Sequence, residues 1–147
     1  TDFLITSKVD TVCFAQGGDY IGDKECTNIV NGFKVFRKMM NLYFFDINKP
    51  IEFKGTINED LTSSVTECRT GRVILTSLMN SITQKETQGQ AGGLTEIYLE
   101  LGTYVKSFYS VIAAPSCVKV ALMGNNQARI HHQVTWKNAV PKIIRES

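Results

Sequence analysis

The chain of 147 residues lacks the features that would place it in a membrane, fibrous or disordered class. Its apolar runs are short, such as Leu42–Phe45, whereas a helix that spans a bilayer needs about 20 apolar residues. Hydrophobic residues make up 43% of the chain and charged residues 20%, which is typical of a folded domain and not of a disordered chain. We therefore expect one globular domain over residues 1–147, without a membrane span.

The sequence also lacks the motifs of common enzyme mechanisms. It contains no Gly-x-Ser-x-Gly nucleophile elbow, no His-Glu-x-x-His zinc motif and no phosphate-binding P-loop. The glycine-rich segment 89–93 has no P-loop lysine, and Glu96 and Glu100 come without the Glu-x-x-His motifs of a di-metal bundle. These absences predict a protein that is not an enzyme and that has no cofactor or metal.

Closely spaced cysteines are missing as well. The four cysteines are Cys13, Cys26, Cys68 and Cys117, and no Cys-x-x-Cys pair of a zinc site occurs among them. An even number of cysteines behind a first residue other than methionine is typical of a processed, secreted protein. We expect an extracellular location and two disulfides rather than four free thiols. The favoured pairing is Cys13–Cys26 with Cys68–Cys117, and the alternative is the nested pairing Cys13–Cys117 with Cys26–Cys68.

Acidic residues are absent from residues 101–145, although the whole chain carries a formal charge of only +2. Residues 1–100 hold 10 basic and 13 acidic groups (−3), and residues 101–147 hold six basic groups and one acidic group (+5). A surface that carries only positive charge can attract an acidic partner. Basic residues never run beyond two in succession, which makes nucleic acid an improbable partner. The predicted binding residues are Lys119, Arg129, His131, His132, Lys137 and Lys142.

The two histidines of this set are neighbours in the sequence. The residues from Arg129 to Trp136 alternate between apolar and polar, as in a hairpin strand. Neighbouring side chains in a strand point to opposite faces, so we expect at most one of the two imidazole rings to serve a given site.

Composition and periodicity favour different folds. Ile, Val and Thr together account for 39 residues, a bias toward strands. Apolar residues nevertheless recur at helical spacing in three windows, residues 23–45, 58–84 and 94–113, and a shorter helix is expected over residues 2–16. Because packing of an apolar face supplies most helix stability, we predict an all-α fold. This fold is a compact bundle of about four helices with an irregular or β-hairpin C-terminal segment; a β-sandwich with nested disulfides is the alternative.

The third window has the cleanest helical pattern, and the second has a recognisable helix start. Asn58 precedes two acidic residues, Glu59 and Asp60, which suit the positive end of a helix dipole. Leu61, Val65 and Cys68 then fall on one face, which we expect to be buried, and polar residues that include Thr62, Thr66 and Thr70 fall on the other.

These observations predict a secreted, disulfide-stabilised binding protein, of the effector, inhibitor or ligand type. Its basic C-terminal surface would recognise a protein or another acidic macromolecule. A first alternative is a carrier of a small hydrophobic ligand, in a cavity lined by aromatic and methionine side chains. The predicted lining residues are Phe36, Met40, Tyr104 and Phe108. A second alternative is a structural protein of the viral coat or nucleocapsid type.

Overall fold

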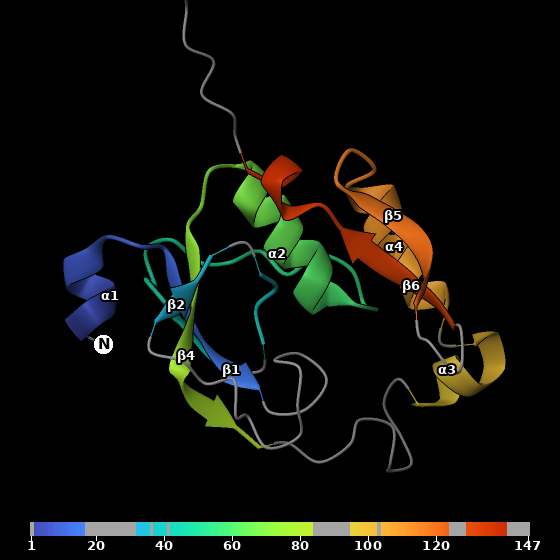
Figure 1. The fold of residues 1–147 in the computed structure, drawn as a ribbon, viewed down its shortest axis with the longest axis horizontal. Coiled ribbons are helices and arrows are strands. Elements are labelled where there is room, and N and C mark those ends of the chain that lie inside the picture. Colours follow the sequence, from blue (N-terminus) through green and yellow to red (C-terminus); the bar gives the residue numbers. More distant parts are fainter. Residues whose placement is uncertain are drawn as a thin grey trace, which may run out of the picture.

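The computed structural model describes residues 2–16, 32–35, 37–40, 42–83, 95–102, 104–123 and 129–140, and in these ranges the fold mixes helices and strands (Figure 1). The elements in chain order are α1 (Asp2–Ser7), β1 (Thr11–Gln16), β2 (Phe33–Lys34), β3 (Tyr43–Phe45), α2 (Glu59–Arg69), β4 (Ile74–Ile82), α3 (Thr95–Leu101), α4 (Val105–Ala113), β5 (Val118–Met123), β6 (Arg129–Val134) and the 3-10 helix η1 (Trp136–Asn138). None of the helices in these ranges combines the length and the apolar character that crossing a bilayer requires.

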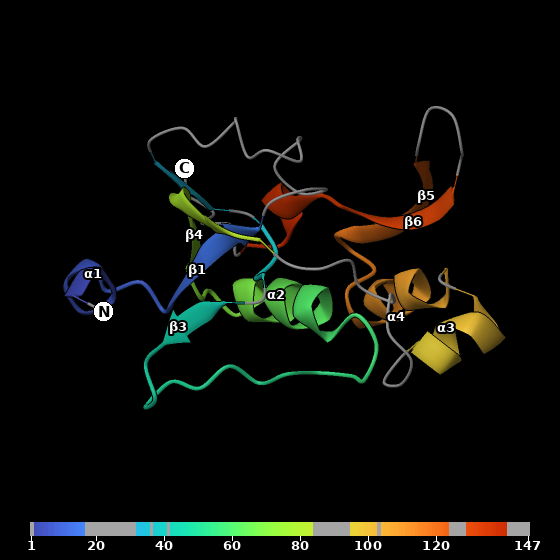
Figure 2. The same ribbon diagram turned by 90° about the horizontal axis from the view of Figure 1, so that it is seen from below.

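Two sheets organise the molecule. The larger sheet has the strand order β2-β4-β1-β3, in which β1 and β4 run parallel and β2 and β3 pair antiparallel with their neighbours. The smaller sheet is the antiparallel pair β5–β6. Helix α2 lies against one face of the larger sheet, and α4 lies against the β5–β6 pair (Figure 2). The prediction of an all-α bundle is therefore wrong, and the alternative of a β-sandwich with nested disulfides is not observed either.

The N-terminal window fails as a helix because its backbone turns after six residues. Lys8 has φ 58°, a left-handed conformation that ends α1. The following residues form β1, in which Thr11, Cys13 and Ala15 are fully buried on one face. This alternation has the period of a strand, and it outweighs the narrow helical stripe. The predicted helix 23–45 is also wrong in its described part, which contains β2 and β3; residues 23–31 lie outside the described residues.

The second window is a helix only in its first half. Helix α2 begins at Glu59 as predicted and ends at Arg69, because Gly71 adopts φ 97° and donates to Cys68 O (3.0 Å). The second half of the window is β4, which is paired on both sides by β1 and β2. The spacing of its apolar residues was compatible with a helix, but pairing between strands decided the outcome.

The third window contains two helices instead of one. Gly102 has φ 80° and donates to Tyr98 O (3.0 Å), which ends α3 one turn before α4 begins. A Cβ atom at this position would lie 2.5 Å from the ring of Tyr104. Only glycine fits this turn without a shift of the ring, and the turn divides the predicted helix.

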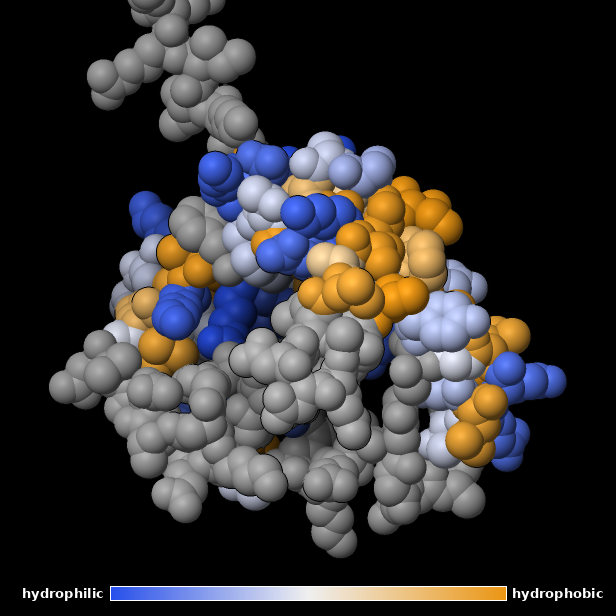
Figure 3. Space-filling view, turned by 45° about the vertical axis from the view of Figure 1, so that its right-hand side comes forward, coloured by the Kyte–Doolittle hydropathy of each residue, from blue (hydrophilic) through white to orange (hydrophobic). Residues whose placement is uncertain are grey.

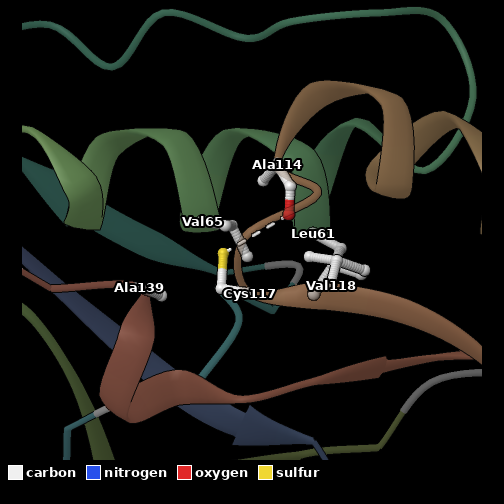
Figure 4. Packing of buried hydrophobic residues seen from close by; sticks show 6 residues of the cluster. All are labelled: Leu61, Val65, Ala114, Cys117, Val118 and Ala139. Carbon is white, nitrogen blue, oxygen red and sulfur yellow. Dashed lines mark hydrogen bonds between the residues drawn. The ribbon is translucent and has the colours of Figure 1, made fainter.

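Buried side chains form two clusters. One joins α2 to the segment around β5 and contains Leu61, Val65, Ala114, Cys117, Val118 and Ala139 (Figure 4). The other joins α2 to the larger sheet and contains Cys13, Met39, Ile51, Cys68 and Ile74. Trp136 packs against both clusters. The apolar stripe predicted for α2 is therefore confirmed as core, since Leu61, Val65 and Cys68 are at most 4% exposed.

Hydroxyl side chains of α2 are buried as well as its apolar ones. Ser64 Oγ accepts a hydrogen bond from Met39 N (2.8 Å), and Ser63 Oγ accepts one from Lys54 N (2.9 Å). Both serines are fully buried. Two stretches of chain without regular structure thus pack against α2, and the hydroxyl groups of the helix satisfy their backbone N–H groups.

The predicted disulfides are not formed. Cys13, Cys68 and Cys117 are free and buried, which rules out both proposed pairings, and Cys26 lies outside the described residues. Burial raises the pKa of the Cys13 thiol to about 12 and that of Cys68 to about 11. These thiols act as small apolar side chains of the core. The expectation of an extracellular location rested in part on the predicted disulfides, so it loses that support.

Candidate functional site

The β5–β6 sheet carries most of the residues predicted to bind a partner. Its register pairs Val118 with Val134 at one end and Leu122 with Ile130 near the other. Val118 and Val134 pack into the core beside α2 and α4. Because side chains alternate along a strand, Leu122 and Ile130 extend the same face away from that core.

The hydrogen-bonding pattern of the β5–β6 sheet can be worked out from the bond between Thr135 and Cys117. Thr135 N donates to Cys117 O (2.7 Å), one residue after β6 ends and one before β5 begins. Hydrogen-bonded and non-hydrogen-bonded pairs alternate in an antiparallel ladder. Lys119 and Ala121 on β5 therefore belong to the pairs that bond to β6.

The intervening residues of β5 turn their backbone groups away from β6. Val118 shows this alternation directly, because its N–H donates outward to Ala114 O (2.9 Å). By the same alternation, the N–H and C=O groups of Val120 and Leu122 point outward. They have no partner within the part of the chain that the structure describes.

Apolar side chains remain exposed at the far end of this sheet. Val118 is 2% exposed, whereas Leu122 is 73% and Ile130 42% exposed. Tyr104, which immediately precedes α4, and Phe108 on α4 form a T-shaped pair with centroids 6.5 Å apart, and both rings are about half exposed. Figure 3 shows hydrophobic side chains gathered on the side of the molecule that α4, β5 and β6 form. Exposed apolar side chains gathered on one side of a molecule are a feature of interaction sites.

The predicted basic residues occupy different parts of this region. Lys119 is exposed on β5, and Lys137 is exposed on η1 beyond the end of β6. Arg129 is the first residue of β6. Lys142 lies outside the described residues.

The two histidine rings lie together, although adjacent strand residues normally diverge. Their centroids are 4.1 Å apart, and His131 Nδ1 lies 3.1 Å from His132 O. The ring of His131 therefore folds along the backbone toward its neighbour instead of standing away from the strand. The expectation that at most one ring could serve a given site rested on that divergence, which the structure does not show.

His132 reaches a buried polar junction between α2, α4 and β6. Asn58 Nδ2 donates to Ser110 Oγ (2.6 Å) and to Lys106 O (3.4 Å), and it lies 3.4 Å from His132 Nδ1. Thr62 Oγ1 lies 3.1 Å from Ser110 Oγ. Asn58, Thr62 and Ser110 are less than a tenth exposed. The junction fixes β6 to the two helices through hydrogen bonds, in continuation of the apolar core.

The environment of His132 favours the neutral imidazole. Burial, followed by the charges of His131, Lys38 and Lys106, lowers the pKa of His132 to about 3, while Asp60 opposes the shift. A neutral ring can accept a hydrogen bond at Nδ1 from the Asn58 amide. His132 therefore contributes to the attachment of the sheet and not to its positive charge.

An ion pair lies beside this junction. Lys38 Nζ is 2.6 Å from Asp60 Oδ2, and the lysine side chain is 11% exposed. Burial and the nearby Glu59 and Asp60 raise the pKa of Tyr98, so its phenol stays protonated. Lys106 Nζ lies 5.7 Å from the centre of the same ring. The Lys38–Asp60 ion pair holds the segment before β3 against the first turn of α2.

The residues proposed to line a hydrophobic cavity are found in different settings. Met40 is buried, and its backbone hydrogen-bonds to the Cys13 thiol in the core. Tyr104 and Phe108 lie on the exposed side of α4. Phe36 lies outside the described residues. Met40 is thus core, whereas the two rings of α4 belong to the exposed apolar surface.

The polar junction could not be recognised in the sequence. Asn58 was identified as the start of a helix, but its side chain makes no capping hydrogen bond and turns to α4 instead. Its left-handed backbone, φ 57°, is the conformation that asparagine tolerates best after glycine. Leu122 and Ile130 did carry a signal, since both are large apolar residues on either side of the Gly124-Asn125-Asn126 sequence.

The surroundings of the site give no sign of a metal centre. The described residues hold no group of three or more His, Cys, Asp or Glu side chains that could bind a metal ion.

Comparison with known protein families, curated proteins and solved structures finds no match to this chain.

Proposed function

We propose that the protein is a binding protein that recognises an acidic polypeptide through its β5–β6 sheet. The observation that carries the proposal is the exposure of this sheet, where Leu122 is 73% and Ile130 42% exposed and Lys119 is exposed on the same strand as Leu122. Apolar residues supply affinity when they are buried by a partner, and exposed basic residues attract a partner of negative charge.

The charge distribution supports an acidic partner. Residues 101–145 contain no Asp or Glu, so no carboxylate from the same stretch of chain neutralises Lys119 or Lys137. The neutral state of His132 leaves the positive charge to the lysines and Arg129. Attraction between such a surface and an acidic segment raises the association rate and weakens as salt is added.

The test measures binding of a fluorescent peptide of alternating glutamate and valine residues. The double variant Lys119→Glu/Lys137→Glu is compared with Lys8→Glu/Lys34→Glu, which changes the net charge equally but on the N-terminal half. We expect about tenfold weaker binding and a flatter salt dependence for the first variant only, since each exposed charge pair contributes up to about 1 kcal/mol. Equal losses in both variants, or no binding by the unaltered protein, would overturn the proposal.

A further inference from the structure

We propose that the outer edge of β5 is a docking edge for an extended polypeptide, and that the partner joins the sheet as a third strand. This inference rests on the proposed function and specifies how the partner binds and what pattern it carries. Addition of a strand uses backbone hydrogen bonds for affinity and alternate side chains for specificity.

The backbone of β5 offers the required groups. The outward N–H and C=O groups of Val120 and Leu122 could form two hydrogen-bonded pairs with an antiparallel strand. They have no partner in the described ranges. The N–H of Val118 is already engaged by Ala114 O, so the open stretch begins after this residue.

The opposite edge of the sheet is less accessible. By the same alternation, the C=O group of His132 points outward from β6, and it lies 3.1 Å from His131 Nδ1. The His131 ring also lies against that of His132, with centroids 4.1 Å apart. A strand approaching β6 would have to displace this ring, whereas β5 has no such cover within the described residues.

The side chains of β5 define the pattern of the incoming strand. Residues opposite Val120 and Leu122 would extend the apolar face, so they should be apolar. Residues on the other face would lie near Lys119, so they should be acidic. The expected partner segment therefore alternates acidic and apolar residues, and pairs of opposite charge on neighbouring strands stabilise this arrangement.

A second copy of β5 does not fit this description. The strand contains Lys119 and no acidic residue, so antiparallel pairing of two β5 strands would bring two lysines to one sheet without a counter-charge. Like charges on neighbouring strands destabilise their pairing. The occupant is thus a different, acidic segment.

The experiment removes a single outward N–H from each edge. Proline is tolerated at an edge where its missing N–H faces outward, so Leu122→Pro leaves the hydrogen bonds to β6 intact. Its matched control is Ile130→Pro, at the residue paired with Leu122 but on the other edge. A second control, Leu122→Ala, shortens the side chain and keeps the N–H group.

With a peptide of about seven alternating glutamate and valine residues, Leu122→Pro should weaken binding about tenfold. Leu122→Ala should weaken it about threefold, and Ile130→Pro should leave it unchanged. A peptide with the same residues in two blocks should bind more weakly. In the unaltered protein, exchange of the Val120 and Leu122 amide protons should slow on binding, a readout that does not depend on the stability of any variant.

The outcomes separate this inference from the proposed function. If the peptide binds and Lys119→Glu/Lys137→Glu weakens it, but Leu122→Pro matches Ile130→Pro and the two amides exchange at unchanged rates, the function stands and strand addition is refuted. If no acidic peptide binds the unaltered protein, both are refuted.

Discussion

Replacement of Asn58 gives a quantitative test of the junction that holds β6 to the helices. The side chain donates to Ser110 Oγ at 2.6 Å in a buried setting, and the residue has a left-handed backbone with φ 57°. Substitution by alanine and substitution by glycine affect the hydrogen bond and the backbone conformation differently. Alanine removes the amide and also suffers the steric cost of the left-handed conformation, whereas glycine removes only the amide.

The expected losses in the free energy of unfolding follow from these terms. Loss of a buried hydrogen bond that leaves its partner less satisfied costs about 1–3 kcal/mol, so Asn58→Gly should lose roughly that much. Asn58→Ala should lose about 1 kcal/mol more because of its backbone. For a chain of this length each kcal/mol corresponds to a fall of about 2–4 °C in Tm.

Urea denaturation followed by Trp136 fluorescence measures both variants. A suitable control is Asn48→Ala, at an exposed residue whose side chain donates to the nearby Asp46 Oδ1 (3.0 Å). If Asn58→Ala and Asn58→Gly are equally stable, the left-handed backbone does not contribute as reasoned. If neither variant is less stable than the control, the junction does not stabilise the fold.

Two further predictions follow from titrating and reactive groups. Because the pKa of His132 is lowered from 6.5 to about 3, only the unfolded chain takes up this proton as pH falls through 6.5, so stability decreases from pH 7.5 to pH 5. The loss should be about 1 kcal/mol after allowance for partial exposure of the ring, and it should disappear in His132→Asn; an unchanged pH dependence in that variant would contradict the assignment. Since the thiols of Cys13 and Cys68 are buried, with pKa values of about 12 and about 11, neither should react with iodoacetamide at pH 8 until the protein is unfolded. Peptide mass spectrometry after alkylation checks this, and modification of Cys13 in the folded protein would refute it.

The sequence predicted the local features of the fold better than its architecture. The start of α2 after Asn58 and the burial of Leu61 and Val65 follow from neighbouring residues, and both are observed. The end of α2 depends on Gly71, whose φ of 97° stops the helix. The glycine was visible in the sequence, but the strand that follows it forms because β1 and β2 lie on either side, and such pairing over long distances is not encoded in periodicity.

The candidate site was only partly accessible to the same reasoning. The absence of acidic residues from residues 101–145 identified the basic region, and alternation indicated the strand that contains both histidines, which is observed as β6. The register that turns the backbone of Leu122 outward could not be predicted. Nor could the contact between Asn58 and Ser110, which are 52 positions apart and meet only when α2 packs against α4.

The strand order also has a consequence for the course of folding. Thr11 of the central strand β1 pairs with Ile74, 63 positions later, whereas β5 and β6 are neighbours in the sequence. Closing a long loop before any contact compensates for it slows folding, while a local hairpin closes readily. During synthesis, β1 must therefore wait for most of the first 82 residues to emerge before its parallel partner is complete. Over that interval β1 lacks its parallel neighbour, and an unpaired strand edge of this kind is prone to aggregation.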